Sequence, residues 1–189
     1  MNKKIVQFFI VFFLFSACSN NYDLQGSQNS SQENVVGIVK KEGGECKIKK
    51  VLKIVDGTSM SPLLRNGQEI NLLENYYKCG NAIQKGDIVA YNYGGDKRPL
   101  IKIVSVISDD EVEIVGSKMS VNGEFLRNSV GQEYNFSKGE INMLKLYIKD
   151  KHIPEETYFL FGDNVSVSTD SRKFGAVSAN DFLGRFDNM

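Results

Sequence analysis

From residue 35 onward the hydrophobic positions come in short bursts, each rich in Ile, Val, Tyr or Phe and bounded by Gly, Asn or Asp. This pattern is typical of β-strands joined by turns. It predicts strands at residues 47–55, 68–73, 87–93, 100–107, 111–115, 141–148 and 157–161. The Asn122-Gly123 pair predicts a tight hairpin, and helical periodicity is limited to a turn or two at 61–66 and 178–182. We therefore expect a mainly-β domain at 35–189, built from short antiparallel strands with long loops.

The N-terminus has the layout of a secretory signal, in which two lysines precede an apolar run at 5–15 and small residues follow. A membrane-spanning helix needs about 20 apolar residues, so this run is too short to be one. The segment ends in Leu14-Phe15-Ser16-Ala17-Cys18, which resembles the box of bacterial lipoproteins. That resemblance implies that residues 1–17 are removed and that Cys18 becomes lipidated. The alternative is an ordinary cleaved signal followed by an incidental cysteine.

The segment at 18–34 has the composition of a tether. Eleven of the sixteen residues at 19–34 are Ser, Asn or Gln, and such a stretch cannot bury enough apolar surface to order itself. We expect it to hold the domain near a bilayer through membrane lipid attached to Cys18. Either interpretation of the signal predicts an extracytoplasmic protein, and the lipoprotein interpretation adds membrane anchoring on the periplasmic side or at the cell surface.

Charge and composition exclude several classes of function. With 23 basic and 23 acidic side chains the net charge is zero, so we expect no nucleic-acid partner. His152 is the single histidine of the chain, which argues against histidine-based metal sites, and we expect neither a metal nor a cofactor. If Cys18 is lipidated, Cys46 and Cys79 remain as an even pair. They are either disulfide-bonded in an oxidising compartment or two free thiols.

Two segments could supply a nucleophile and a base. Ser59 follows a predicted strand on a turn that contains Gly57 and ends at Pro62, where backbone amides could face a reacting group. The alternative is a serine that only forms the turn. Lys102 lies in the middle of the apolar run at 100–107. It is either an edge lysine with its amine in water or a buried lysine, whose lowered pKa would let a neutral amine take a serine proton.

A third segment, residues 161–172, is a polar loop that leaves an apolar run. Ser168 could hydrogen-bond an amine, and Asp170 could hold Arg172 in an ion pair. The alternative is a solvated loop with Asx turns.

Together these segments resemble type I signal peptidases, the serine–lysine proteases that remove signal peptides from exported proteins. The resemblance runs from about Val51 to Phe186. The matching motifs are Gly57-x-Ser59-Met60-x-Pro62, Gly86-Asp87-Ile88-Val89, and Gly162-Asp163-Asn164 followed by Ser168, Asp170-Ser171-Arg172 and Gly175. The hairpin at Asn122-Gly123 also falls where the family has one.

The resemblance implies a signal-peptidase-like fold and a serine endopeptidase that cleaves peptide or preprotein substrates at signal peptides or signal-like segments. Ser59 would be the nucleophile and Lys102 the general base. Ser168 would orient the lysine amine, and Asp170 with Arg172 would brace the loop. The side chains implied to line the pocket for the last residue before the scissile bond are Met60, Leu64 and Ile101.

The chain also departs from the family pattern. Ile103 stands where members usually have an arginine after the base, so a charged contact to Asp170 is missing. Residues 105–110 replace a segment that contains Pro-Gly-Asp, and Leu63 stands where threonine is usual. These departures leave an alternative open: a catalytically weak or inactive membrane-tethered lipoprotein that binds extended peptides through the same groove.

Overall fold

Two antiparallel sheets make up most of the computed structural model, which describes residues 34–41, 44–94 and 98–187. The large sheet has the strand order β1-β2-β3-β11-β4-β5-β9-β10. Its strands are β1 (Asn34–Lys41), β2 (Gly44–Ile54), β3 (Glu69–Glu74), β4 (Ile88–Tyr91), β5 (Leu100–Val106), β9 (Thr157–Phe161), β10 (Val177–Ser178) and β11 (Phe182–Phe186). The predicted signal at 1–17, Cys18 and the tether up to residue 33 lie outside the described residues.

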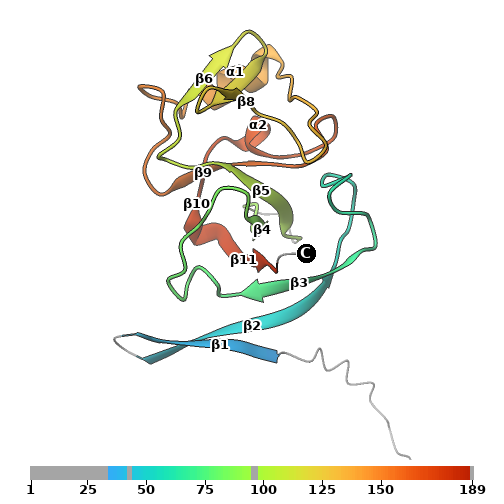
Figure 1. Cartoon of the computed structure of the whole chain (residues 1–189), viewed down its shortest axis with the longest axis vertical. Coiled ribbons are helices and arrows are strands. Elements are labelled where there is room, and N and C mark those ends of the chain that lie inside the picture. The colour runs from blue at the N-terminus through green and yellow to red at the C-terminus, as the bar shows by residue number, and fades with distance from the viewer. Residues whose placement is uncertain (1–33, 42–43, 95–97, 188–189) are drawn as a thin grey trace, which may run out of the picture. The chain divides into compact units, whose positions relative to one another are not determined.

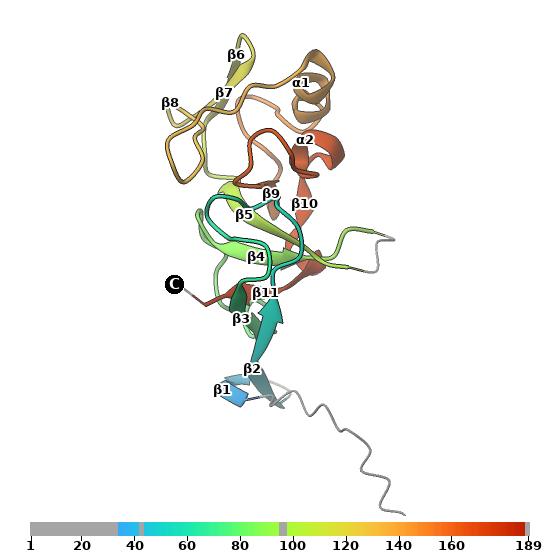
Figure 2. The ribbon, with the colours of Figure 1, turned by 90° about the vertical axis from the view of Figure 1, so that its right-hand side faces the viewer.

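The second sheet is a three-stranded meander inserted between β5 and β9. It consists of β6 (Val112–Val115), β7 (Lys118–Val121) and β8 (Glu124–Phe125). Figures 1 and 2 show it beside helix α1 (Lys138–Lys145), on the side of the large sheet that carries β9 and the short helix α2 (Ser171–Phe174). Asn122 and Gly123 both have positive φ in the turn between β7 and β8, which confirms the predicted hairpin.

The sequence predicted the mainly-β class correctly, but one of its strands is wrong. A strand was predicted at 141–148, but helix α1 occupies residues 138–145 and includes the first five residues of that segment. The reason is a capping box: Ser137 accepts from the Glu140 amide while the Glu140 carboxylate accepts from the Ser137 amide. The predicted turn at 178–182 is a 3₁₀ segment, Ala179–Asp181, that leads directly into β11.

Three apolar clusters form the core. One packs between the small sheet, α1 and β9, and one packs on the side of the large sheet that carries Val89, Val104 and Leu160. The third contains Val55, Met60, Leu64, Ile70, Leu72, Ala90 and Phe186. This third cluster lies directly under the turn that follows β2, so it supports the part of the chain that contains Ser59.

A disulfide joins Cys46 on β2 to Cys79 in the segment between β3 and β4, with the two Cα atoms 5.4 Å apart. This settles the sequence-based alternative of two free thiols in favour of the bond. Within the described ranges, no helix has the length and apolar character needed to cross a bilayer.

Candidate active site

The turn that carries Ser59, here called the serine turn (residues 55–64), begins where β2 ends, and hydrogen bonds hold it near its start and at its end. Gly57 adopts φ +98°, a conformation that side chains disfavour, and its amide donates to Asn66 Oδ1 at 2.8 Å. The amide of Leu64 then donates to the Met60 carbonyl at 2.8 Å, which closes a single helical turn. Met60 is buried in the cluster below, so the turn is anchored by this side chain while Ser59 stays half-exposed.

Lys102 lies on β5, an interior strand between β4 and β9, and its side chain is 1% exposed. Its Nζ lies 3.1 Å from Ser59 Oγ and donates to the Ile101 carbonyl at 2.7 Å. Burial lowers the pKa of Lys102 from 10.5 to about 8, while Asp170 raises it and Arg172 lowers it further. Lys102 is therefore not an edge lysine with its amine in water, and at pH 7 about one tenth of the amine is unprotonated.

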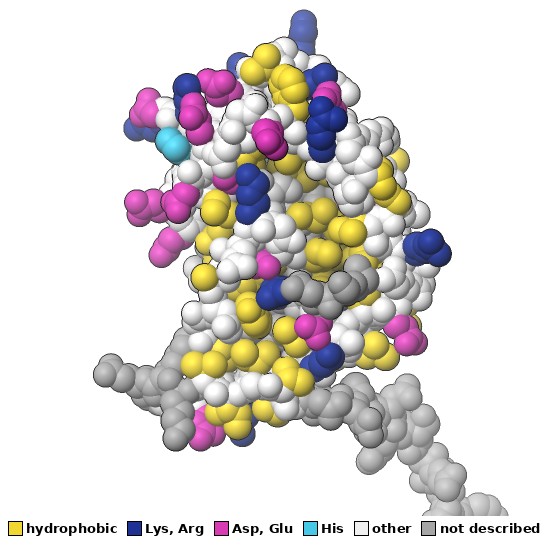
Figure 3. Space-filling view, in the orientation of Figure 1, with side chains coloured by type: hydrophobic (Ala, Val, Ile, Leu, Met, Phe, Trp, Pro, Cys, Tyr) yellow, Lys and Arg dark blue, Asp and Glu magenta, His cyan; other side chains and the backbone are white. Residues whose placement is uncertain are grey.

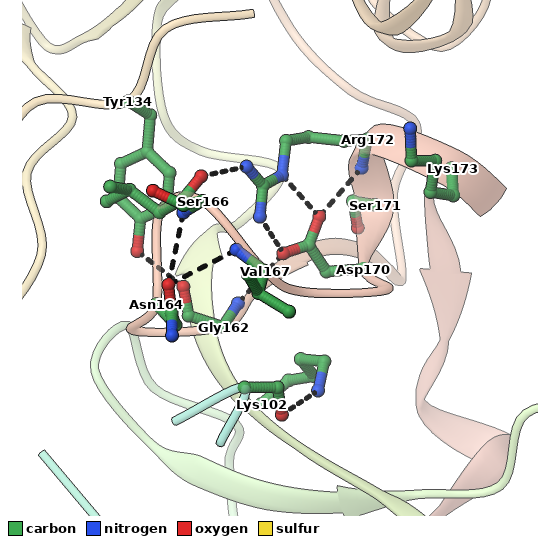
Figure 4. A network of polar contacts seen from close by, with 12 residues as sticks. Lys102, Tyr134, Gly162, Asn164, Ser166, Val167, Asp170, Ser171, Arg172 and Lys173 are labelled. Carbon is green, nitrogen blue, oxygen red and sulfur yellow. Dashed lines mark hydrogen bonds and ion pairs between the residues drawn. The ribbon is translucent and has the colours of Figure 1, made fainter. Parts of the chain in front are cut away.

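The loop after β9 carries the remaining predicted residues (Figure 4). Asp170 is fully buried and accepts two hydrogen bonds from the Arg172 guanidinium, from Nε and from Nη2, each at 2.8 Å. The same carboxylate accepts from the amides of Gly162 and Arg172, so it also caps α2. Arg172 Nη1 donates to the Val165 carbonyl at 2.6 Å. The pair thus ties both ends of the loop together.

Ser168, which the resemblance implies orients the lysine amine, lies in the same loop. In the described part of the chain its buried Oγ has no hydrogen-bond partner, and it packs beside Gly162. The Lys102 amine is hydrogen-bonded to Ser59 and to the Ile101 carbonyl. Ile103, which replaces the usual arginine, packs against the apolar cluster under the serine turn and carries no charge toward Asp170.

Two cavities meet at Ser59. The larger, about 460 Å³, has mostly apolar walls that include Met60 and Ile101. Leu64 lies in the same apolar cluster as Met60 but is not among the residues that line this cavity. Figure 3 shows hydrophobic side chains gathered over the middle of the face seen there, with charged side chains around them.

The smaller cavity, about 350 Å³, is more polar and is lined by residues of the serine turn and of the loop at 167–169. The residues common to both cavities are Asp56, Gly57, Ser59, Leu100 and Lys102. Ser59 and Lys102 are thus placed where a chain lying across both cavities would pass. Among the residues described, no group of three or more His, Cys, Asp or Glu side chains could hold a metal ion.

Several residues that hold the site were missed by the sequence reasoning. Asp163 is fully buried, and its carboxylate accepts from the Leu63 amide at 3.0 Å and from the amide and hydroxyl of Ser129. Asn164 donates from its amide to the Ser59 carbonyl and from its side chain to the Thr58 carbonyl. The Gly162-Asp163-Asn164 motif was a signal for two of them, whereas nothing in the sequence marked Ser129.

Known proteins of similar sequence match most of the folded domain. The model of the family described as "Signal peptidase, peptidase S26" matches residues 49–189. Signal peptidase IB of Staphylococcus aureus is 28% identical over 141 residues, which cover 69% of this chain and 72% of that protein. Signal peptidase I U of Bacillus subtilis is 24% identical over 132 residues, covering 69% and 70%. A crystal structure of a signal peptidase I from Enterococcus faecalis matches with a TM-score of 0.37 and 22% identity, covering 56% of this chain and 97% of that one. The chain therefore belongs to the signal peptidase family S26, a membership that supports the cleavage of signal peptides as its general activity.

Proposed function

We propose that this protein is a serine endopeptidase that cleaves signal peptides or signal-like segments of exported proteins, with Ser59 as nucleophile and Lys102 as general base. The observation that carries the proposal is the 3.1 Å contact between Ser59 Oγ and the amine of a lysine that is 1% exposed. An amine can act as a base only when it is neutral, and burial lowers the pKa of Lys102 to about 8.

The geometry supports the following sequence of proton transfers. The Ile101 carbonyl accepts one N–H of the neutral amine, which leaves the nitrogen lone pair for the Ser59 hydroxyl. Lys102 takes the serine proton as Oγ attacks the scissile carbonyl, and it returns that proton to the leaving amine when the C–N bond breaks. Backbone amides near Ser59 would hold the oxyanion. Water then attacks the acyl carbonyl while Lys102 takes its proton. When the ester C–O bond to Ser59 breaks, Lys102 gives this proton to Ser59 Oγ, which releases the acid and restores the serine.

The supporting residues have separate roles in this proposal. Asp170 and Arg172 neutralise each other and brace the loop beside the lysine. Ser168, whose hydroxyl has no hydrogen-bond partner among the described residues, would orient the lysine amine during the reaction.

The substrate would lie extended and pair its backbone with the chain edges at 53–57 and 99–101, in the manner of an added strand. Met60 and Ile101 would face the residue before the scissile bond, with Leu64 packed behind them. Their bulk favours a small residue there.

The sequence pattern supports the cellular setting. We propose that residues 1–17 are a lipoprotein-type signal, that Cys18 carries lipid, and that the tether at 18–34 holds the domain on the extracytoplasmic side of a membrane.

The test is cleavage of an Ala-x-Ala signal-peptide substrate by the full chain in detergent. Ser59→Ala should lower kcat/KM by at least about 10³-fold. Ser61→Ala is the matched control, because Ser61 lies in the same turn and its Oγ donates to the Leu64 carbonyl at 3.4 Å, whereas Ser59 Oγ lies beside the Lys102 amine. Cleavage by Ser59→Ala at the wild-type rate would refute the assignment.

The alternative is a peptide-binding lipoprotein of little or no activity, favoured by the unpartnered Ser168 hydroxyl and by Ile103 in place of a charged residue. Wild-type protein that binds the peptide without cleaving it would support this alternative.

A further inference from the structure

The loop at 126–136, which follows the small sheet, reaches back to the start of the loop that carries Asp170. The Asn128 side chain donates to the Asp163 carbonyl at 3.0 Å, and Ser129 donates to the Asp163 carboxylate. Tyr134 Oη donates to the Gly162 carbonyl at 2.8 Å. The backbone at 162–163 is therefore held by side chains of the loop that follows the small sheet.

Tyr134 makes a second contact at the other end of that loop. Its side chain is 2% exposed, and the Arg172 guanidinium carbon lies 5.6 Å from the centroid of its ring (Figure 4). The ring also packs on Phe161, with the centroids 5.4 Å apart. Burial raises the pKa of the Tyr134 phenol, so the hydroxyl remains a donor throughout the working pH range.

Gly162 contacts both the Tyr134 hydroxyl and the residues around Ser59. Its amide donates to the Asp170 carboxylate at 3.0 Å, and its carbonyl accepts from Tyr134. Its α-carbon packs so closely against the Ser59 carbonyl and Ser168 Oγ that a Cβ atom would not fit. A displacement of Gly162 therefore displaces the wall behind Ser59.

The ring of Tyr134 acts through Arg172. Because Ile103 supplies no charge next to Asp170, the guanidinium is held in the described part of the chain by Asp170, by the Val165 carbonyl and by the tyrosine ring. The positive charge of Arg172 lowers the pKa of Lys102, and the negative charge of Asp170 raises it. A guanidinium that moves away would leave Asp170 less neutralised, and both changes would make the lysine harder to deprotonate.

We infer that Tyr134 is a positioning residue for the Ser59–Lys102 pair, acting through the Gly162 carbonyl and the Arg172 guanidinium. The inference rests on the proposed function and extends it to a residue of the loop at 126–136, whose hydroxyl donates to Gly162 and not to Ser59 or Lys102.

The test uses Tyr134→Phe, which removes only the hydroxyl, and Tyr134→Leu, which also removes the ring. The matched control is Tyr147→Phe. Tyr147 packs against the same core and has a ring contact with Phe159, and among the described residues its hydroxyl has no hydrogen-bond partner. For each full-length variant in detergent, kcat, KM and the unfolding midpoint are measured. The titration of Lys102 is followed by NMR of protein with ¹³C-labelled lysine.

Tyr134→Phe should lower kcat about threefold to tenfold, the usual effect of losing one buried hydrogen bond, with little change in KM. Tyr134→Leu should lower kcat further and shift the Lys102 titration to higher pH, whereas Tyr147→Phe should change neither. The inference is overturned if both Tyr134 variants lose only stability, with wild-type kcat per folded molecule and an unchanged Lys102 titration. If the wild type cleaves no peptide, the proposed function fails, and the Lys102 titration alone then decides the role of Tyr134.

Discussion

Replacing Lys102 with methionine should abolish cleavage and at the same time stabilise the fold at neutral pH. Methionine keeps the length and apolar bulk of the side chain but has no basic group. Lys102 is among the most buried side chains of the described part of the chain, so its charge is unfavourable there. A residue retained at the expense of stability is expected at a site whose chemistry needs it.

The size of the effect follows from the pKa difference between the folded and unfolded states. Folding lowers the pKa of Lys102 from 10.5 to about 8, and each unit corresponds to about 1.4 kcal/mol. At pH 7 the unfolded chain holds this proton more tightly than the folded one, so the free energy of unfolding is reduced by about 3 kcal/mol. Stability rises with pH between about 8 and 10.5, because there the unfolded state binds more protons, and the penalty falls below about 1 kcal/mol near pH 10.

The loss of the hydrogen bonds to Ser59 and to the Ile101 carbonyl offsets about 1 kcal/mol of the gain. Lys102→Met should therefore be about 2 kcal/mol more stable than wild type at pH 7 and no more stable near pH 10.

Urea unfolding of both proteins at the two pH values measures this difference, with Lys145→Met, an exposed lysine at the end of α1, as the control. In parallel, wild-type kcat/KM should rise about tenfold per pH unit below pH 8 and level off above it. The reasoning would be refuted by a Lys102→Met protein that cleaves substrate, or by one whose free energy of unfolding differs from that of wild type by the same amount at pH 7 and pH 10.

Three further changes test other parts of the molecule. Ile101→Ala should admit Val and Leu before the scissile bond, relaxing the discrimination by about 1–3 kcal/mol in competition assays; an unchanged preference would place Ile101 only in the core. Cys46→Ser opens a disulfide between residues 33 positions apart, so urea unfolding should show a loss of about 4 kcal/mol, and an unchanged midpoint would contradict the bond. Cys18→Ser should release the protein from membranes or block its processing; wild type that incorporates no labelled fatty acid yet sediments with membranes would rule out lipidation.

The sequence predicted most strands because each buries alternate or consecutive β-branched residues, a signal that is local. It failed at 141–148, where the apolar residues fit either a strand or a helix and the deciding contact is the cap between Ser137 and Glu140. It also missed β11, whose Gly184 weakens the strand pattern. A side chain at position 184 would collide with the Leu73 carbonyl of β3, so only glycine fits there.

The residues of the candidate site also differ in whether the local sequence marks them. Ser59 and Lys102 were recognisable because their residue types are unusual in their positions, a serine on a glycine turn and a lysine inside an apolar strand. Ser129 and Tyr134 were not recognisable, because they act on backbone groups and on a side chain more than 25 positions away. Such contacts depend on how the two sheets meet, which no local pattern records.

The buried Asp163 carboxylate affects which segments of this protein unfold together. One buried carboxylate accepts from the amide of Leu63 in the serine turn and from Ser129 in the loop of the small sheet. The serine turn cannot separate from that loop without leaving the carboxylate unpaired in the interior. The two segments should therefore unfold as one cooperative unit, and the Leu63 amide should exchange its hydrogen as slowly as the amides of β7. The turn that carries Ser59 would thus be as rigid as the core, although it lines a surface cavity.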